Sequence, residues 1–304
     1  MIAPEARERL LRALGPRIRF DVPMARLTSL RVGGPADAVA APADRAELAL
    51  LLRLCHELRL PHLLLGSGFN TLALDGPLEA VVVQLSRFRQ IEERPGGMLR
   101  VEAGVSHSQV TRFCSQRGLS GLEFAAGIPG TVGGWLAMNA GVPGRELRDV
   151  LVELEVMSPT GSRRRHLPAT ALHFVYRALR GLAPGTALVS ALLRVTHATP
   201  ASVREEVERL LARRAATQPL SVPSCGSVFK NPKGDYAGRL IESVGLKGFR
   251  VGGAQFSPMH ANFIANTGGA SAADVCALMR EAQQRVHAAS GLHLEPEVHV
   301  VGRG

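Results

Sequence analysis

One stretch of the sequence constrains the fold more than any other, because strand-like and helix-like patterns alternate in it and it ends in a glycine-rich turn. Residues 36–41 are apolar enough for a short strand, and residues 44–58 repeat leucine at helical spacing behind a capping-box-like start at Asp44. Residues 62–65 then form a second apolar run, which ends at Gly66-Ser67-Gly68-Phe69-Asn70. This order predicts a β-α-β-like unit with a glycine turn after its second strand.

The glycine turn at residues 66–70 does not fit a dinucleotide-binding fingerprint of the Rossmann type. It lacks the third glycine of G-x-G-x-x-G, and residues 71–74 look extended where that fingerprint needs a helix. Successive backbone N–H groups in such a turn can still form a nest for an anion. By itself, the turn is therefore compatible with a phosphate site and equally with an ordinary turn.

A second glycine-rich turn, Gly127-Ile128-Pro129-Gly130-Thr131-Val132-Gly133-Gly134, is more specific. It leads into residues 135–139, which can start a helix. Glycine lets a ligand approach the backbone, and N–H groups at the start of a helix hold phosphate well. Two such turns suit a ligand with two phosphates, such as a dinucleotide cofactor, and we favour this interpretation over two ordinary turns.

Further elements of both kinds follow along the chain. Residues 81–85, 151–157 and 187–195 are strand-like. A helix with an apolar face at Val203, Val207, Leu210 and Leu211 is expected to start at a capping box of Ser202 and Glu205, and a second helix is expected from Ser271, with Asp274 as its box partner and Gly291 past its end. The change of character near residue 198 predicts a domain boundary there.

Composition restricts the class of protein. The chain has 304 residues, of which 46% are hydrophobic and 20% charged, so it is expected to form about two folded domains. No apolar run is long enough to cross a membrane and the N-terminus does not resemble a signal peptide, so we expect a cytosolic, soluble protein. Its four cysteines are far apart, which favours reduced thiols over a disulfide or zinc framework.

The net charge of +10 favours anionic partners, which include nucleic acids, membrane surfaces and anionic small molecules. Nucleic acid is the weaker alternative, because the arginines are scattered apart from the run at 163–165 and the aromatic residues number only 13. No metal site is predicted, since His56-Glu57 lacks a second histidine at the required spacing.

Three candidates for chemistry remain in the second half of the chain. Residues 226–232 bring Ser227, Lys230 and Asn231 into one short turn, but no G-x-S-x-G motif accompanies them, and a capped turn is the simpler interpretation. Glu297 lies between apolar residues, where an unpartnered carboxylate is costly. Arg177 follows an apolar run, although a surface arginine or a salt-bridged glutamate would also explain these two residues.

In this order, the motifs resemble those of one family, the UDP-N-acetylenolpyruvoylglucosamine reductases, from about residue 28 to residue 302. The matching segments are Thr28-Ser29-Leu30-Arg31-Val32-Gly33-Gly34-Pro35-Ala36-Asp37, the two glycine turns, Asn139-Ala140-Gly141, Tyr176-Arg177, Gln218-Pro219, residues 224–232, 237–242 and 245–248, His260-Ala261-Asn262-Phe263, and residues 294–298. Each segment is weak alone, but the ordered set is specific.

The resemblance implies an α+β fold: an FAD-binding module of the vanillyl-alcohol-oxidase (PCMH) type followed by an α+β substrate-binding domain. The FAD-binding domain would cover residues 1–197, with subdomains at about 17–80 and 81–197. The substrate-binding domain would cover 198–292, and residues 293–304 would form a strand that returns to the FAD site. The spacing between Arg177 and Ser227 resembles the shorter subclass of the family.

The resemblance also implies a set of site residues. FAD would be held by Gly66, Ser67, Gly68, Phe69, Asn70, Thr71, Gly127, Ile128, Pro129, Gly130, Gly133, Gly134, Asn139 and Gly141. The catalytic residues would be Arg177, Ser227 and Glu297, and contacts to the uridine diphosphate would come from Arg214, Lys230, Asn231, His260 and Asn262.

The implied reaction reduces UDP-N-acetylglucosamine enolpyruvate to UDP-N-acetylmuramate in peptidoglycan precursor synthesis, with NADPH as reductant of the flavin. Arg177 and Glu297 would stabilise the enolate-like charge after hydride transfer from flavin N5, and Ser227 would donate the proton. We expect a monomer that binds NADPH and a UDP-sugar and neither binds nucleic acid nor inserts into a membrane. A flavin oxidase on the same FAD module, using O₂, is the alternative.

Several positions depart from the family pattern. They are Phe69, where a small serine is usual, Val142-Pro143, Ala178-Leu179 after Tyr176-Arg177, and His299, where arginine is frequent. These departures leave the three expected catalytic positions intact and concern local contacts to the flavin and the sugar.

Overall fold

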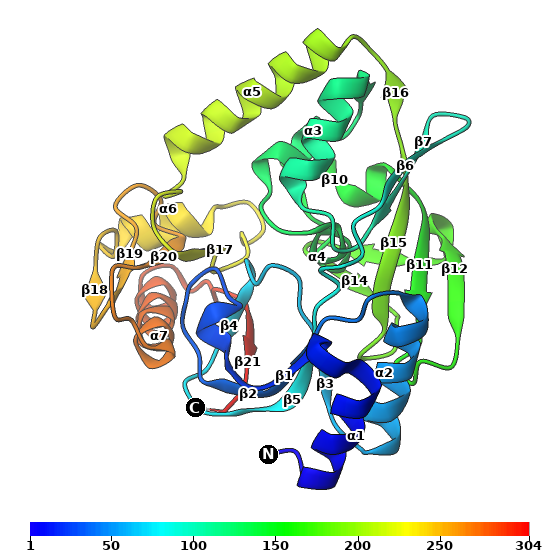
Figure 1. Cartoon of the computed structure of the whole chain (residues 1–304). Coiled ribbons are helices and arrows are strands. Elements are labelled where there is room, and N and C mark those ends of the chain that lie inside the picture. Colours follow the sequence, from blue (N-terminus) through cyan, green and yellow to red (C-terminus); the bar gives the residue numbers. More distant parts are fainter. Residues whose placement is uncertain (304) are drawn as a thin grey trace. The chain divides into compact units, whose positions relative to one another are not determined.

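The computed structural model describes residues 1–303, which form two compact units. Unit 1 comprises Met1–Phe20, Ala38–Gly66 and Ala80–Arg213; unit 2 comprises Asp21–Asp37, Ser67–Glu79 and the chain from Arg214 onward. The chain passes between units within three strands of one sheet, namely β1 (Ile18–Pro23), β2 (Pro35–Ala40) and β5 (Leu78–Val83). The units therefore interleave along the sequence (Figure 1).

The first part of unit 1 contains the predicted strand–helix–strand unit, which the structure confirms. Its sheet has the order β1-β2-β5-β3, and β3 (His62–Leu64) runs parallel to β5. Helix α2 (Arg45–Glu57) buries the predicted leucines together with α1 (Pro4–Leu14) in one hydrophobic core. Asp44 caps α2 by accepting from the Glu47 N–H at 2.9 Å, whereas the Glu47 carboxylate bonds the Arg17 guanidinium and the Ala43 N–H.

The second part of unit 1 is built on a five-stranded antiparallel sheet of order β12-β11-β15-β7-β6. Its strands are β6 (Ile91–Arg94), β7 (Met98–Glu102), β11 (Leu151–Met157), β12 (Arg164–Pro168) and β15 (Ala187–Arg194). The strands predicted at 151–157 and 187–195 are thus confirmed. A second core packs on this sheet and includes residues of α3 (His107–Arg117) and α4 (Val132–Ala137). The hairpin β13 (His173–Val175)–β14 (Ala178–Arg180) and two short pairs complete the unit: β8 (Leu119–Ser120) with β16 (Thr196–His197), and β9 (Gly141–Val142) with β10 (Arg145–Glu146).

Unit 2 has its own core between a small sheet and two helices. The sheet order is β17-β20-β19-β18, all antiparallel, with β17 (Ser224–Ser227), β18 (Arg250–Val251), β19 (Ala254–Phe256) and β20 (Phe263–Asn266). Helices α6 (Ala237–Ser243) and α7 (Ala272–Ser290) pack with it, and β4 (Thr71–Ala73) pairs in parallel with β21 (His299–Val301). Residues 71–74 are therefore extended, as expected.

The two long helices differ in how well the sequence predicts them. Helix α7 has the predicted capping box of Ser271 and Asp274, and Gly291 ends it in the left-handed conformation. Helix α5 (Pro200–Thr217) begins earlier than predicted, because the Thr199 hydroxyl accepts from the Ser202 N–H at 3.1 Å and Pro200 fits the first turn. Its expected apolar face is only half buried: Val203 and Val207 are buried, whereas Leu211 is 42% exposed.

Three general properties follow from the described residues. Within residues 1–303, no helix is both long and apolar enough to cross a membrane. No cluster of three or more histidine, cysteine, aspartate or glutamate side chains that could hold a metal occurs in the same range. The four cysteines are free thiols, and burial raises the pKa of Cys55, Cys114 and Cys225 to about 12, so these three behave as small apolar side chains at neutral pH.

Candidate active site

Gly66, the first residue of the first glycine-rich turn, contacts the second turn within unit 1. A Cβ atom built on Gly66 would lie 2.7 Å from the Thr131 hydroxyl oxygen, so only glycine permits this approach without a shift of Thr131. The contact joins the first residue of the first turn to the middle of the second turn, although the two are distant in the sequence. Within unit 1, the start of the first turn thus lies against Thr131 of the second turn.

Backbone hydrogen bonds fix the second turn against the end of β7. The Val132 and Gly133 N–H groups donate to the carbonyls of Val105 and Ala103 at 3.0 and 2.9 Å. Helix α4 starts at Val132, inside the turn and earlier than the expected residue 135, and these two N–H groups belong to its first residues. A phosphate would therefore be bound by other N–H groups of the turn, and Gly130, with φ of +118° and no atom within 4 Å of an added Cβ, keeps the backbone open there.

The other end of the second turn is held from inside the unit. The indole N–H of Trp135 donates to the Ile128 carbonyl at 3.2 Å, and the Trp135 ring is 2% exposed. Pro129 follows directly and restricts the backbone further. The turn is thus a rigid loop anchored on both sides.

Asn139 connects this region to Arg177. Asn139 is fully buried, and its amide donates to Glu146 Oε2 at 2.9 Å and to the Val175 carbonyl at 3.3 Å while its oxygen accepts from the Arg148 N–H. Val175 is the last residue before the turn that carries Arg177. The amide of Asn139, which is also predicted to contact FAD, therefore bonds the hairpin that carries Arg177.

Arg177 occupies a strained position in a two-residue hairpin turn. Val175 pairs with Ala178 across the hairpin, which leaves Tyr176 and Arg177 as the turn residues. Arg177 has φ of +58°, a left-handed conformation that costs a residue with a Cβ about 1 kcal/mol or more. Its Nη1 donates to the Gly141 carbonyl at 3.1 Å, and its guanidinium carbon lies 5.2 Å from the centre of the Tyr176 ring. Such strain in a polar residue is typical of functional sites.

In unit 2, the rest of the first turn packs on the Thr28-Ser29 segment. Gly68 has φ of +67°, and a Cβ there would lie 2.3 Å from the Leu27 carbonyl oxygen, so this position requires glycine. The Ser29 N–H and hydroxyl both bond the Gly68 carbonyl, at 3.2 and 3.1 Å, and the same hydroxyl lies 2.6 Å from the Ser224 carbonyl. Ser29 thereby ties the turn to β17, a role that the sequence signals only through the motif around it.

The segment carrying Ser227 lies alongside the segment carrying Glu297. The Glu297 N–H donates to the Val228 carbonyl at 2.8 Å, and the Lys230 N–H donates to the Glu295 carbonyl at 2.9 Å. The side-chain amide of Asn70, from the first turn, donates to the Glu297 carbonyl at 3.1 Å. The backbone carbonyl of Asn70 accepts from the His299 N–H at 3.0 Å. Unit 2 thus brings together the end of the first turn, Ser227 and Glu297.

The Asn262 side chain holds the Ser227 segment through hydrogen bonds to Phe229. Its oxygen accepts from the Phe229 N–H at 3.0 Å and its amide donates to the Phe229 carbonyl at 2.8 Å, so one side chain binds both polar groups of one peptide residue. Asn262 is 2% exposed. Asn262, which is also predicted to contact the substrate, orients the backbone two residues from Ser227.

The remaining expected substrate contacts lie around the same segment or at the end of α5. Lys230 pairs with Glu295, and the Asn231 side chain accepts from the Ala237 N–H at the start of α6 at 3.0 Å. Burial lowers the pKa of His260, whose Nδ1 accepts from the Asn262 N–H at 3.3 Å, so His260 is neutral at pH 7 and has its other ring nitrogen as a donor. Burial also lowers the pKa of Arg214, which donates from Nε to Gln218.

The positions that depart from the family pattern take ordinary places in these elements. Ala178 and Leu179 pair with Val175 and Phe174 in the hairpin, and Val142 pairs with Arg145 in the β9–β10 pair. His299 begins β21 and pairs with Thr71, directly after the first turn. These residues therefore shape the surroundings of Arg177 and of the first turn.

The arrangement fits FAD in the manner of a PCMH-type module. In unit 2, the C-terminal strand β21 returns to β4, the strand that follows the first turn. Of the expected catalytic residues, Arg177 belongs to unit 1 and Ser227 and Glu297 to unit 2.

Comparison with known proteins defines the class. Residues 36–166 match the family model of an FAD binding domain, and residues 218–301 match the UDP-N-acetylenolpyruvoylglucosamine reductase C-terminal domain. The chain is thus an FAD-binding oxidoreductase of α+β fold, as predicted.

Similarity over the whole chain identifies the family. The UDP-N-acetylenolpyruvoylglucosamine reductase of Anaeromyxobacter sp. (strain K) is 46% identical over 96% of this chain and 87% of the relative, and that of Geobacter metallireducens is 44% identical over 97% of each. The crystal structure of the Thermus caldophilus reductase superposes with a TM-score of 0.81 at 34% identity, covering 94% of this chain and 100% of that one. The chain belongs to the UDP-N-acetylenolpyruvoylglucosamine reductase family, which confirms the resemblance seen in its motifs.

Proposed function

We propose that this protein uses FAD and NADPH to reduce UDP-N-acetylglucosamine enolpyruvate to UDP-N-acetylmuramate, a step of peptidoglycan precursor synthesis in the cytoplasm. The observation that carries the proposal is the junction in unit 2, where Asn70 of the first glycine turn bonds the Glu297 carbonyl and the Ser227 segment pairs with the Glu297 segment. This junction attaches the expected proton donor and its acidic partner to the turn expected to hold the cofactor.

The domain roles follow the same proposal. Residues 1–197 would serve as the FAD-binding domain, 198–292 as the substrate-binding domain and 293–304 as the strand that returns to the flavin. The diphosphate of FAD would be bound by N–H groups of residues 66–71 and 127–134, with glycine supplying the close approach. When bound, FAD supplies the hydride that N5 transfers to the terminal carbon of the enolpyruvyl double bond.

Arg177 and Glu297 would act on the substrate carboxylate. Hydride addition at the CH₂ carbon drives the double-bond electrons toward the carboxylate and generates an enolate-like charge. The Arg177 guanidinium stabilises that charge, and its strained backbone and its bond to Gly141 hold it in one orientation. Glu297, when protonated, donates a hydrogen bond to the same carboxyl group.

Ser227 would complete the reduction by donating its hydroxyl proton to the carbon adjacent to the carboxylate. The product then has one new C–H bond from the hydride and one from this proton, and solvent reprotonates the serine. Asn262 keeps the following backbone in place for this transfer. Lys230, Asn231, Arg214 and neutral His260 would bind the uridine diphosphate, consistent with the net charge of +10.

A spectroscopic experiment tests the proposal. The purified protein should be yellow with bound flavin, NADPH should bleach it without oxygen, and the enolpyruvyl nucleotide should restore the colour faster than air does. Faster reoxidation by air than by the nucleotide would support the flavin oxidase alternative and contradict the reductase. A colourless protein that FAD cannot reconstitute would contradict both.

A further inference from the structure

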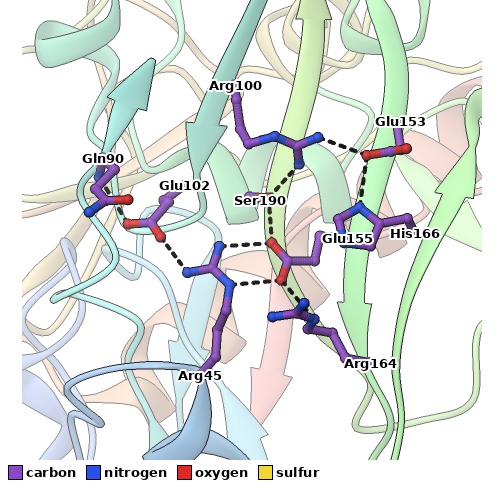
Figure 2. A network of polar contacts seen from close by, with 9 residues as sticks. All are labelled: Arg45, Gln90, Arg100, Glu102, Glu153, Glu155, Arg164, His166 and Ser190. Atoms are coloured by element: carbon purple, nitrogen blue, oxygen red, sulfur yellow. Dashed lines mark hydrogen bonds and ion pairs between the residues drawn. The ribbon is translucent and has the colours of Figure 1, made fainter.

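A cluster of charged side chains in unit 1 joins two buried carboxylates to a half-buried arginine and takes no part in the proposed reaction (Figure 2). Glu155 on β11 and Glu102 on β7 are 2% and 6% exposed. Arg45, the first residue of α2, lies between them, and its Nε and Nη2 donate to the two oxygens of Glu155 at 2.7 and 2.8 Å. Its Nη1 donates to Glu102 Oε1 at 2.7 Å, so one guanidinium connects α2 to two strands of the five-stranded sheet.

Each carboxylate oxygen of Glu102 and Glu155 has a defined hydrogen-bond partner. The second oxygen of Glu102 accepts from the Gln90 N–H at 2.9 Å, and Glu155 Oε2 also accepts from the Ser190 hydroxyl at 2.7 Å. A buried ion cluster of this kind is weak support for stability, because apolar residues of similar volume often replace one without loss. Its distinctive property is the fixed fork of the guanidinium, which holds three elements at set distances.

The Glu102 end of the cluster leads directly to the second glycine turn. Glu102 is the last residue of β7, and the next residue, Ala103, accepts from the Gly133 N–H at 2.9 Å. The chain continues beside the turn, with the Val105 carbonyl accepting from Val132 and the His107 N–H donating to the Gly130 carbonyl. The position of Glu102 therefore sets the position of residues 130–133.

The Arg45 end of the cluster leads to the first turn. Arg45 starts the helix that follows β2, and Gly66 follows β3, which runs parallel to β5. The Gln84 N–H donates to the Ala40 carbonyl at 2.9 Å and the Leu65 N–H to the Val83 carbonyl at 3.0 Å, so the carboxyl ends of β2, β5 and β3 are tied at one edge. The start of α2 and the first turn thus belong to the same edge of the first sheet.

We propose that Arg45 is a positioning residue for the cofactor: by holding Glu102 and Glu155 it fixes the first sheet to the second and sets the spacing of the two glycine turns at the Gly66–Thr131 contact. The inference rests on the proposed placement of the FAD diphosphate at these turns. A change in the cluster should then weaken FAD binding although no member of the cluster belongs to either turn.

The test is an FAD titration of the apoprotein of Arg45→Lys beside wild type and a matched control, Arg100→Lys. Lysine keeps the charge but cannot bind both oxygens of Glu155 and reach Glu102. Arg100 lies on β7 and binds Glu153, and it touches the cluster only through the Ser190 hydroxyl at 3.3 Å, without any bond to α2. It therefore controls for the loss of an arginine from this sheet while the link to α2 stays intact. We expect the Kd for FAD to rise about tenfold in Arg45→Lys and less than about twofold in Arg100→Lys.

A second readout separates positioning from plain stability. If Arg45 positions the turns, the rise in Tm that FAD gives to the apoprotein should shrink in Arg45→Lys and in a second, isosteric variant, Glu102→Gln. An unchanged Kd and an unchanged FAD-induced rise, with only the apoprotein Tm lowered, would overturn the inference while leaving the proposed function intact. A wild-type apoprotein that does not bind FAD would overturn the proposed function and this inference together.

Discussion

Two clusters, one in each unit, hold backbone segments by different chemistry. In unit 1, Arg45 joins α2 to the five-stranded sheet through the buried carboxylates of Glu102 and Glu155. In unit 2, neutral amides are used, since Asn262 holds Phe229 by both of its backbone groups and Asn70 bonds the Glu297 carbonyl. The first cluster depends on charges that must stay ionised, whereas the second consists of groups that do not titrate.

The difference has a functional consequence. A charge cluster holds elements firmly through forked hydrogen bonds, but it depends on pH and tolerates the loss of one partner poorly. A side-chain amide that bonds the backbone N–H and C=O of one residue keeps these bonds at every pH at which the protein stays folded. We therefore expect the cofactor region of unit 1 to be sensitive to acid and the Ser227 segment of unit 2 to be insensitive.

The largest effect is expected from removing the group that the amides of unit 2 position. Ser227→Ala should lower turnover about 10²–10⁴-fold, the range for loss of a general acid, while binding of the enolpyruvyl nucleotide changes little. Steady-state kinetics with NADPH measure this. Ser224→Ala on the same strand is the control, because Ser224 supplies a backbone carbonyl to Ser29. Equal activity of Ser227→Ala and wild type would remove Ser227 from the mechanism.

The next largest effect concerns the amide clasp, the pair of hydrogen bonds between the Asn262 side chain and the backbone of Phe229. Asn262→Leu leaves the buried N–H and C=O of Phe229 without their partners, which should lower the free energy of unfolding by about 3 kcal/mol. Urea denaturation at pH 7 and at pH 5 should give the same loss, because no titrating group is removed. A loss that grew between these pH values would show that the clasp is coupled to a charge, against the contrast between the units.

Acid should act on the charge cluster of unit 1. Burial raises the pKa of Glu155, but the hydrogen bonds from Arg45 and Ser190 together with the positive charge of Arg45 outweigh it and hold the pKa at about 2, well below its ordinary value near 4.5. A carboxylate with a depressed folded pKa contributes stability that is complete above the unfolded pKa and is lost as pH falls toward the folded one. The free energy of unfolding should therefore fall by about 2–3 kcal/mol more in wild type than in Glu155→Gln between pH 5 and pH 2. Parallel urea-midpoint curves for the two proteins would contradict this.

A smaller effect sharpens the comparison, because one carboxylate in unit 2 also joins two elements. Asp75 accepts from the Ala272 and Ala273 N–H groups at the start of α7, both at 2.9 Å, but it is exposed to solvent. Asp75→Asn should cost about 1 kcal/mol, as expected for an exposed helix cap, and should leave the Kd for FAD unchanged. Thermal denaturation measures the first and an FAD titration the second. A large loss would mean that unit 2 also relies on charge.

Much of the framework follows from local sequence. The strand–helix–strand unit, both glycine turns and the capping box of α7 depend on neighbouring residues, so their patterns are visible in the sequence. The predicted start of α5 was wrong, because Thr199 and Pro200 offer a cap three residues ahead of the Ser202 motif, which matches the capping-box pattern better. Two caps in succession cannot be ranked by pattern alone.

The contacts that organise the site depend on distant residues and leave no local pattern. Arg45 and Glu155 are 110 positions apart, so nothing near either residue marks the pair. Asn139 and Asn262 stay predicted ligand contacts, but the sequence does not show that the Asn139 amide also bonds Val175 and that the Asn262 side chain also bonds Phe229. The left-handed backbone of Arg177 likewise results from the hairpin register that pairs Val175 with Ala178.

The most direct test of the account compares the two half-reactions in Arg177→Met by anaerobic stopped-flow absorbance of the flavin. Reduction by NADPH does not generate the enolate-like charge, so its rate should stay near that of wild type. Reoxidation by the enolpyruvyl nucleotide requires that charge to be stabilised and should slow about 10²-fold or more. Equal slowing of both half-reactions would contradict the assignment of Arg177, and with it the proposed site.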